Sequence, residues 1–293
     1  MKAIFKKELR ALMGGLRGWG YIAIMLLGGG VSAFLLNLLN MSTRFEASAN
    51  YIALFLIPAT VAAATDSFMA DRRQNTERLI FSLPIKNSDI VLGKLLAHLV
   101  PVAAAGAGLC VFPLILSLYG TVGWAAALSS ILAITVLGAA MMAIGLCISA
   151  CSRSRLIAVL GIAAVLIASW AAPMAADLIA SRGELNLLMM ASFMMVGFAA
   201  VYLLSGSALL GIFAAAAIEV PVLLAYLKGN GAELMASIGK GIDSMNLFGG
   251  LNPFINGLFD GRVLIGWLAV AALFAFMTAL VLAGRRQAKR RAL

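Results

Sequence analysis

The chain has 293 residues, of which 63% are apolar and only 12% are charged, and its mean hydropathy is +1.02. Soluble domains are about half apolar and a quarter charged, so this composition excludes a soluble enzyme and indicates a chain that lies mostly in lipid. In such a chain the net charge of +10 reports membrane orientation rather than a nucleic-acid partner. The three cysteines and the single histidine exclude a disulfide framework and a multi-histidine metal site.

Eight stretches are apolar enough to cross a membrane as helices, since a hydrocarbon core about 30 Å thick needs about 20 mostly apolar residues. They cover residues 19–40, 51–70, 91–119, 124–150, 156–180, 186–204, 207–227 and 263–284. Only three uncharged residues separate the sixth from the seventh, so this pair is alternatively a hairpin that does not fully cross. The sequence therefore predicts an all-α integral membrane protein, a bundle of about 6–8 transmembrane helices that forms one domain over residues 1–293.

The basic residues are distributed unevenly over the two sides of the predicted spans. Seventeen of the 22 lie before the first span, between the second and third, between the fourth and fifth, or after the last. The five on the other side are Arg44, Arg182, Lys228, Lys240 and Arg262. Because positively charged loops stay in the cytoplasm, we predict that both termini and the loop 71–90 are cytoplasmic in a multi-pass protein of the cell membrane.

Residues 1–18 are predicted to form an amphipathic helix on the cytoplasmic membrane surface. Phe5, Leu9, Leu12 and Leu16 recur at helical spacing, and the basic residues of this segment lie off that stripe. The alternative is a positively charged topology anchor. In both cases the segment needs anionic lipid headgroups as partners.

The sequence contains no nucleotide-binding loop of its own. The pattern G-x-x-x-x-G-K-[ST] is missing, because neither Gly-Lys pair, at 93–94 and 239–240, is followed by Ser or Thr. We therefore expect no ATP hydrolysis, and no bound cofactor, in this chain. His98, near the cytoplasmic end of the third predicted span, is expected to pack between helices.

Glu219 is the one carboxylate that the predicted spans place deep in the membrane. It lies two residues before Pro221, whose ring removes a backbone donor and favours a kink. A charge at mid-membrane costs about 2.5–3.5 kcal/mol on insertion scales, so Glu219 should face a cavity or a partner. The functional hypothesis places both residues on a translocation pathway. The alternatives are a polar group hydrogen-bonded between helices, or a shallower position because the seventh segment does not span.

The cytoplasmic loop after the second span contains a short segment that can form a helix. It begins with Thr76 as a cap and ends at Pro84. Its apolar side is formed by Leu79, Ile80 and Leu83. The next helix then begins at Ser88 or Asp89, and Lys94 is long enough to extend its ammonium to the membrane surface. A short helix held rigidly here can transmit the movement of a docked soluble protein to the spans. The alternative is that this segment is only a solvated connector between two spans.

The order of residues in this loop resembles the first cytoplasmic loop of type-2 ABC transporter permeases. In that family the loop has an acidic residue, basic residues, G-T-x-E, a leucine run, L-P-[IV], polar residues and I-V-L-G-K. The matching residues are Asp71-Arg72-Arg73, Thr76, Ser82-Leu83-Pro84-Ile85 and Ile90-Val91-Leu92-Gly93-Lys94. Two positions depart from the pattern: Asn75 replaces the glycine, and the glutamate is shifted to Glu77, with Arg78 in its usual place.

Two further segments are similar to the same family. Lys6-Lys7-Glu8-Leu9 resembles the F-x-K-E-L opening of its N-terminal surface helix. The stretch from Asn252-Pro253-Phe254 through Gly257, Phe259 and Asp260 resembles the region before its last span.

The resemblance implies that residues 71–90 contain a coupling helix that sits in a groove of a separate ATPase. The residues implied in coupling are Arg73, Asn75, Thr76, Glu77, Arg78, Leu79, Leu83 and Pro84. Two ATPase subunits, which bind ATP and Mg, would assemble with two permeases, the second being a copy of this chain or a paralogue. The resemblance further implies export across the inner membrane of a bacterial or archaeal cell.

The family resemblance also implies a gate on the outer side, within the loop 228–262. Its residues are Asn252, Pro253, Phe254, Phe259 and Asp260. Small residues cluster elsewhere, at 28–30, 103–108 and 138–140, where helix backbones can approach closely. They serve either a second permease or packing within one chain.

Two other functions fit the residues. One is an ion-coupled secondary transporter that uses Glu219, and the other is a membrane anchor that docks a cytoplasmic protein. A carrier would move its substrate along an ion gradient without an ATPase. An anchor would bind its partner through the loop 71–90 but would transport nothing.

Overall fold

The computed structural model describes residues 2–73, 86–181, 240–241, 243 and 246–291. The described residues form helices and their connections, with no strand among them. The chain divides into two compact units, Met1–Leu166 together with Phe248–Leu293, and Ile167–Leu247. The first unit holds nearly all of the described helices.

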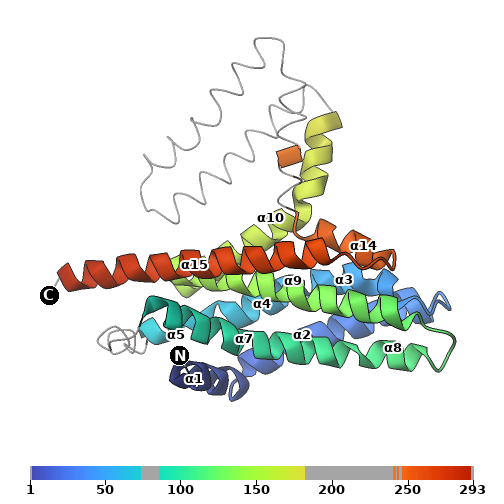
Figure 1. The fold of residues 1–293 in the computed structure, drawn as a ribbon, viewed down its shortest axis with the longest axis horizontal. Helices are drawn as coiled ribbons and strands as arrows, with labels where there is room; N and C mark the ends of the chain where they lie inside the picture. The colour runs from blue at the N-terminus through green and yellow to red at the C-terminus, as the bar shows by residue number, and fades with distance from the viewer. Residues whose placement is uncertain (1, 74–85, 182–239, 242, 244–245, 292–293) are drawn as a thin grey trace, which may run out of the picture. The chain divides into compact units, whose positions relative to one another are not determined.

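These helices form a series of long spans joined by short helical segments (Figure 1). In chain order they are α1 Lys2–Met13, α2 Leu16–Ser32, the π-helix η1 Ala33–Leu38, the 3-10 helix η2 Phe45–Ser48, α3 Ala49–Leu54, α4 Leu56–Ala64, α5 Asp66–Arg73, α7 Asn87–Leu109, α8 Val111–Leu116, α9 Trp124–Cys151, α10 Arg155–Ser181, the 3-10 helix η3 Phe248–Leu251, α14 Asn252–Ile255 and α15 Gly261–Arg291.

Five of the described helices are long and apolar enough to cross a membrane, and a pair bent by 43° is either a broken sixth span or a re-entrant loop. The five are Leu16–Leu38, Asn87–Leu116, Trp124–Cys151, Arg155–Met174 and Gly261–Gln287, and the bent pair is Phe45–Leu54 with Leu56–Arg73. The prediction of an all-α membrane protein is confirmed. The predicted spans 186–204 and 207–227, and residues 228–239 of the predicted outer loop, lie outside the described residues.

Two of the spans are interrupted, and a proline explains each break. Helix α3 ends at Leu54, four residues before Pro58, and α7 ends at Leu109, four residues before Pro113. Proline has no N–H to donate to the carbonyl four residues earlier, so the helical ladder cannot continue through these points. Both prolines then lie in the first turn of the following helix, where the missing donor is tolerated.

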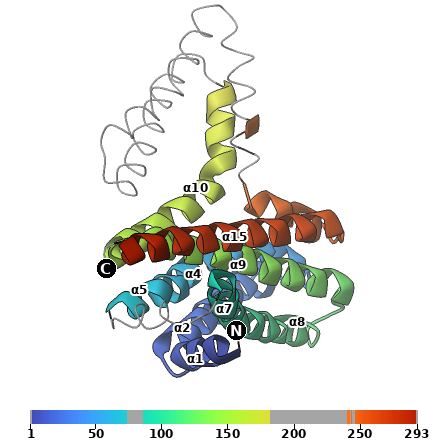
Figure 2. The same ribbon diagram turned by 60° about the vertical axis from the view of Figure 1, so that its left-hand side comes forward.

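Helix α9 forms the centre of the first unit. In the most apolar window of α9, 72% of the residues are buried, against 11% for α15. Helix α9 packs against α15, α7 and α4 (Figures 1 and 2). Small side chains such as Ala133, Ala140 and Ala143 are buried along it and let these neighbours approach closely. Among the described residues, α9 is therefore enclosed by its neighbours, whereas most of the α15 surface is exposed.

The clustered glycines make contacts within the chain. A Cβ atom at Gly28 would overlap the Phe55 ring, and one at Gly106 would overlap the Thr135 side chain. These glycines allow α2 to approach the break between α3 and α4, and α7 to approach α9. Of the two alternatives for the small residues, the structure supports packing within one chain at these positions.

We expect Gly28→Ala to lower the free energy of unfolding by about 1–3 kcal/mol, because the added methyl group must displace the Phe55 ring in a packed interior. Gly20→Ala, also on α2, is the matched control, since a Cβ there meets nothing within 4 Å. The control should be neutral or stabilising by about 0.5–1 kcal/mol. Thermal unfolding in detergent measures both, and equal stabilities would contradict the tight approach at Gly28.

Candidate functional site

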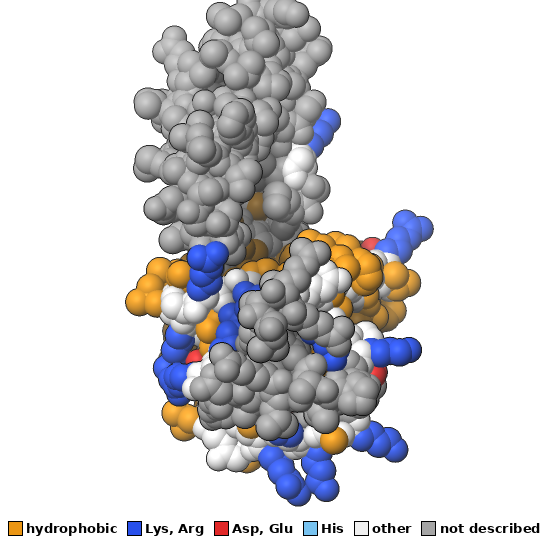
Figure 3. Space-filling view, turned by 90° about the vertical axis from the view of Figure 1, so that its left-hand side faces the viewer, with side chains coloured by type: hydrophobic (Ala, Val, Ile, Leu, Met, Phe, Trp, Pro, Cys, Tyr) orange, Lys and Arg blue, Asp and Glu red, His pale blue; other side chains and the backbone are white. Residues whose placement is uncertain are grey.

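One end of the first unit gathers many charged side chains, and we call it the basic end. It is formed by α1, the last turns of α5 and α9, the first turns of α7 and α10, and the C-terminal part of α15 (Figure 1). Figure 3 looks onto this end and shows Lys and Arg side chains over it. The basic residues placed here by hydrogen bonds, ion pairs or a shared cavity are Lys7, Arg17, Arg72, Arg73, Lys94, Arg153, Arg155, Arg285 and Arg286.

Lys94 of α7 lies at the centre of the basic end and is only 1% exposed. Its Nζ is 2.7 Å from Glu8 Oε1 of α1 and 2.7 Å from Asp71 Oδ2 of α5. The ammonium also donates to the carbonyl oxygen of Ser67 at 2.8 Å. An ammonium group has three donors, so all three are satisfied.

Lys7 completes this arrangement, because its Nζ lies 2.9 Å from Asp71 Oδ1. We call Lys7, Glu8, Asp71 and Lys94 the Lys94 network. Its two positive and two negative charges cancel. The Phe68 ring, whose centroid is 4.9 Å from Lys94 Nζ, gives the ammonium a further favourable contact.

The Lys94 network adjoins an apolar cluster at the same end. Its members are Phe68, Ile90, Val91, Leu146, Ala150 and Leu282. In such surroundings a charge without a partner is costly, so the members of the network depend on one another.

The Lys94 network joins two of the three segments whose sequences resemble one family. Glu8 belongs to the N-terminal motif, and Asp71 and Lys94 are the two ends of the loop motif, and the sequence did not predict that they meet. The prediction that Lys94 extends to the membrane surface is wrong, because its ammonium turns inward to the two carboxylates. Glu8 offered a signal, since it lies beside Leu12 on the apolar side of α1 and both residues are buried.

Arginines from two helices hold the C-terminal end of α9. Arg72 of α5 donates to the carbonyl oxygens of Ala150, at 2.5 Å, and of Ser152. Arg285 of α15 donates to the carbonyl oxygen of Cys151 at 2.9 Å. The last carbonyls of a helix lack intrahelical partners and carry partial negative charge, so guanidinium groups stabilise them. These contacts fasten α5 and α15 to the end of α9.

The structure describes one of the eight residues implied in coupling. Arg73 is exposed at the last position of α5. The other seven, which are Asn75, Thr76, Glu77, Arg78, Leu79, Leu83 and Pro84, lie outside the described residues, as do Glu219 and Pro221 of the suggested pathway. The structure does describe the two helix ends that flank this segment, which are the end of α5 and the start of α7.

His98 lies one turn after Lys94 on α7 and is completely buried. Its Nδ1 is 2.8 Å from the carbonyl oxygen of Lys94. This burial agrees with the expectation that it packs between helices. Among the residues that the structure describes, no three His, Cys, Asp or Glu side chains are grouped to hold a metal ion.

The suggested gate residues lie at the opposite end of the first unit, around the short helix α14. Phe254 is completely buried, and its ring stacks on Trp267 with centroids 6.3 Å apart. The rings of Phe254 and Phe259 are perpendicular, with centroids 6.0 Å apart. Asp260 accepts a hydrogen bond from the backbone N–H of Arg262 at 2.9 Å. Phe254 is therefore a packing anchor, and Asp260 caps the last span.

Asn252 and Pro253 of the suggested gate form the first turn of α14. The carbonyl oxygen of Asn252 accepts a hydrogen bond from Asn256 Nδ2 at 2.9 Å. This bond and the proline make the turn rigid, so Phe254 is held in one position.

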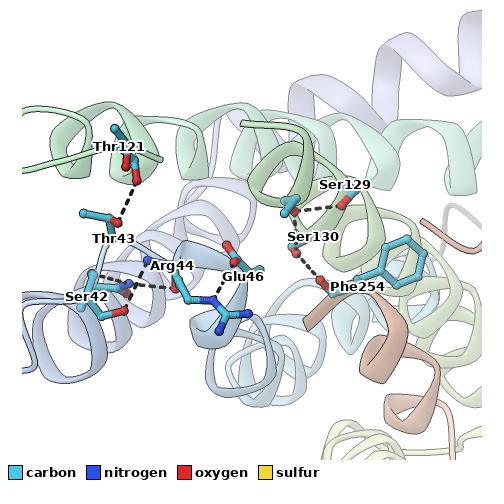
Figure 4. Close-up of polar contacts among 10 residues, drawn as sticks. Ser42, Thr43, Arg44, Glu46, Thr121, Ser129, Ser130 and Phe254 are labelled. Carbon is cyan, nitrogen blue, oxygen red and sulfur yellow. Dashed lines mark hydrogen bonds and ion pairs between the residues drawn. The ribbon is translucent and has the colours of Figure 1, made fainter. Parts of the chain in front are cut away.

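Polar contacts connect α14 and the neighbouring loop to α9 (Figure 4). Ser130 of α9 donates to the carbonyl oxygen of Phe254 at 3.2 Å. In the loop after η1, Thr43 donates to the carbonyl oxygen of Thr121 at 2.8 Å, and Arg44 pairs with Glu46 at 3.2 Å. Helix α9 is thus held by polar contacts at both of its ends.

The fold and these contacts define a multi-span, all-α membrane protein with a cluster of paired charges at the base of one loop. A family model described as ABC-2 family transporter protein matches residues 2–182, which is more than half of the chain. The chain belongs to this family, and it is a permease component of an ABC transporter. A search of curated proteins and a search of solved structures each gave no match. The matched residues include the whole Lys94 network, whereas α14 and α15 lie outside them.

Proposed function

We propose that this chain is the membrane-spanning subunit of an ATP-driven exporter, and that a separate ATPase drives it through the loop 71–90. The observation that carries the proposal is the Lys94 network. Asp71 and Lys94 lie on either side of the loop's central segment and are 2.7 Å apart, and Lys94 is also bound to Glu8. A push on the loop would act on α1, α5 and α7 together, because separating them would leave buried charges unpaired.

Helix α9 provides the route from the loop to the other side of the membrane. Arg72 holds its C-terminal end, and Ser130 near its N-terminal end is bonded to Phe254. Roughly 30 Å of helix separates the two contacts. In this proposal the gate formed by Asn252, Pro253, Phe254, Phe259 and Asp260 moves when α9 moves.

The distribution of charge supports the proposed orientation. The basic end carries both termini of the first unit and the described residues on either side of the segment 74–85. The predicted spans assign 17 of the 22 Lys and Arg residues of the sequence to this side. By the positive-inside rule the basic end faces the cytoplasm of a bacterial or archaeal cell, where a soluble ATPase can reach it. The partners in this proposal are two ATPase subunits, which bind ATP and Mg, and a second permease that is a copy or a paralogue.

Reversing two charges in the loop tests the proposal. We expect Glu77→Lys combined with Arg78→Glu to weaken co-purification with the ATPase by about tenfold or more, and to remove ATP-dependent transport. The control for docking is Arg262→Glu, an exposed charge reversal at the opposite end, which should leave co-purification with the ATPase unchanged. Loss of docking with normal transport would reject the coupling role.

Transport along an ion gradient by the purified chain in liposomes, without an ATPase, would reject the ATP-driven mechanism in favour of a carrier.

A further inference from the structure

A cavity of about 370 Å³ lies at the basic end, between α2, α5 and the turn that joins α9 to α10. Its charged lining consists of Arg17, Asp66, Arg72, Arg73, Arg153 and Arg155. The volume falls within the range of about 300–1,000 Å³ that is usual for ligand pockets. The Lys94 network does not line it, so the cavity is a separate feature of this end.

The lining of the cavity has a large excess of positive charge. Among the described lining residues Asp66 is the only carboxylate, and Asp66 Oδ1 already pairs with Arg155 Nε at 3.2 Å. Arg17, Arg73 and Arg153 make no hydrogen bond and no ion pair within the described part of the chain. Several guanidinium groups around one cavity repel one another unless an anion lies between them. The cavity therefore suits an anionic ligand.

Guanidinium groups bind phosphate well, as they do carboxylate, because their planar fork donates two parallel hydrogen bonds to two oxygens of the anion. Here the arginines come from three different elements that converge on one volume. A phosphate group held between them would accept bonds from α2, from α5 and from the α9–α10 turn.

The surroundings place the cavity at the level of lipid headgroups. Trp19, in the first turn of α2, is 57% exposed, and its Nε1 donates to the carbonyl oxygen of Met13 at 2.8 Å. Tryptophan in this position is typical of the membrane interface. Leu16, Leu156 and Leu160 are 88%, 67% and 55% exposed beside the arginines in sequence, and they offer an apolar surface to acyl chains. A phosphate group that carries acyl chains fits this combination better than a soluble one.

We propose that the cavity binds the phosphate-bearing headgroup of an anionic membrane lipid, with Arg17, Arg73 and Arg153 as the principal ligands. Basic pockets between membrane helices bind such headgroups in general. The bound lipid ties α2 and α5 to the α9–α10 turn at the basic end. This inference does not depend on the proposed function, because it concerns the chain without its ATPase.

Native mass spectrometry of the full chain in detergent tests the inference. We expect phosphatidylglycerol to bind, and phosphatidylcholine with the same acyl chains to bind about tenfold or more weakly, since its headgroup has no net charge. Arg17→Gln combined with Arg153→Gln should weaken phosphatidylglycerol binding by about tenfold or more. Arg153 is exposed, so Arg153→Gln alone provides a variant whose folding is not at risk and which should show part of this loss.

The control variant removes the same number of charges outside the cavity. Lys240 and Arg262 are both exposed, lie outside the N-terminal segment and do not line the cavity. Lys240→Gln combined with Arg262→Gln should keep the affinity for phosphatidylglycerol within about twofold of the unmodified chain. Equal losses in the two double variants, or equal binding of both lipids, would overturn the proposal. Inorganic phosphate that displaces phosphatidylglycerol at millimolar concentration would assign the site to a soluble anion and would also overturn it.

Discussion

Lys94→Ala is expected to lower the free energy of unfolding by about 3–5 kcal/mol and to abolish the coupling of the ATPase to the permease. The substitution leaves Glu8 and Asp71 buried without the cation that each contacts at 2.7 Å. Removing one partner of a buried ion pair is costly because the remaining charge has lost both water and its counter-charge. Thermal unfolding in detergent measures the first effect, and ATP hydrolysis by the reconstituted complex measures the second.

The control for this prediction is Lys6→Ala. Lys6 is an exposed cation on α1, and its removal should change the free energy of unfolding by less than about 0.5 kcal/mol. A second variant separates lost packing from unpaired charge: Lys94→Met combined with Glu8→Gln keeps the volume and removes one charge of each sign. We expect it to recover a large part of the lost stability but not the coupling. If Lys94→Ala and Lys6→Ala changed the free energy of unfolding equally, the Lys94 network would not hold together the helix ends that flank the loop 71–90.

Phe254→Ala is expected to cost about 3–5 kcal/mol, the usual range for deleting a buried phenylalanine side chain. Phe254 is completely buried between α9 and the stacked Trp267 ring, so the vacated volume has no ready replacement. Unfolding followed by tryptophan fluorescence measures the loss in a chain whose other three tryptophans are replaced by phenylalanine, since the ring of Trp267 then reports on this site.

The matched control is Phe259→Ala, because Phe259 touches Phe254 with its ring edge but is itself 64% exposed. Its truncation should cost about 1 kcal/mol or less. A loss of several kcal/mol at Phe259, or none at Phe254, would contradict the assignment of Phe254 as the anchor of α14. A gating role predicts in addition that Phe259→Ala changes transport while leaving the chain folded.

The spans were predictable because a membrane imposes one dominant constraint, a run of about 20 apolar residues. The interruptions inside the second and third spans were not predicted, although Pro58 and Pro113 carried the signal. Hydropathy averages over a window, so it cannot detect a single missing N–H at a fixed position. The missing N–H of Pro58 and of Pro113 coincides with both helix ends. Helices α7 and α10 continue through Pro101 and Pro173, so a proline alone does not predict where a helix ends.

The Lys94 network shows the limit of reading motifs one at a time. Glu8 and Lys94 are 86 positions apart, and no local pattern states that two such residues meet. The prediction for Lys94 considered only the length of its side chain and the nearby water. That prediction did not consider Glu8 and Asp71. Both carboxylates lie next to apolar residues of their own helices and are buried, so each needs a cation as a partner. Charged residues on the apolar sides of two different segments are a signal for a pair.

The central claim is that an ATPase delivers force to this chain at the loop 71–90, and photo-cross-linking in cells tests it most directly. A photoreactive amino acid is placed at Leu79 in the loop and, as the comparison, at Leu258, which is 65% exposed at the opposite end. We predict that mass spectrometry will identify a nucleotide-hydrolysing subunit bound to position 79 and not to position 258. A cross-link to such a subunit from position 258 alone, or its absence from position 79, would contradict the account.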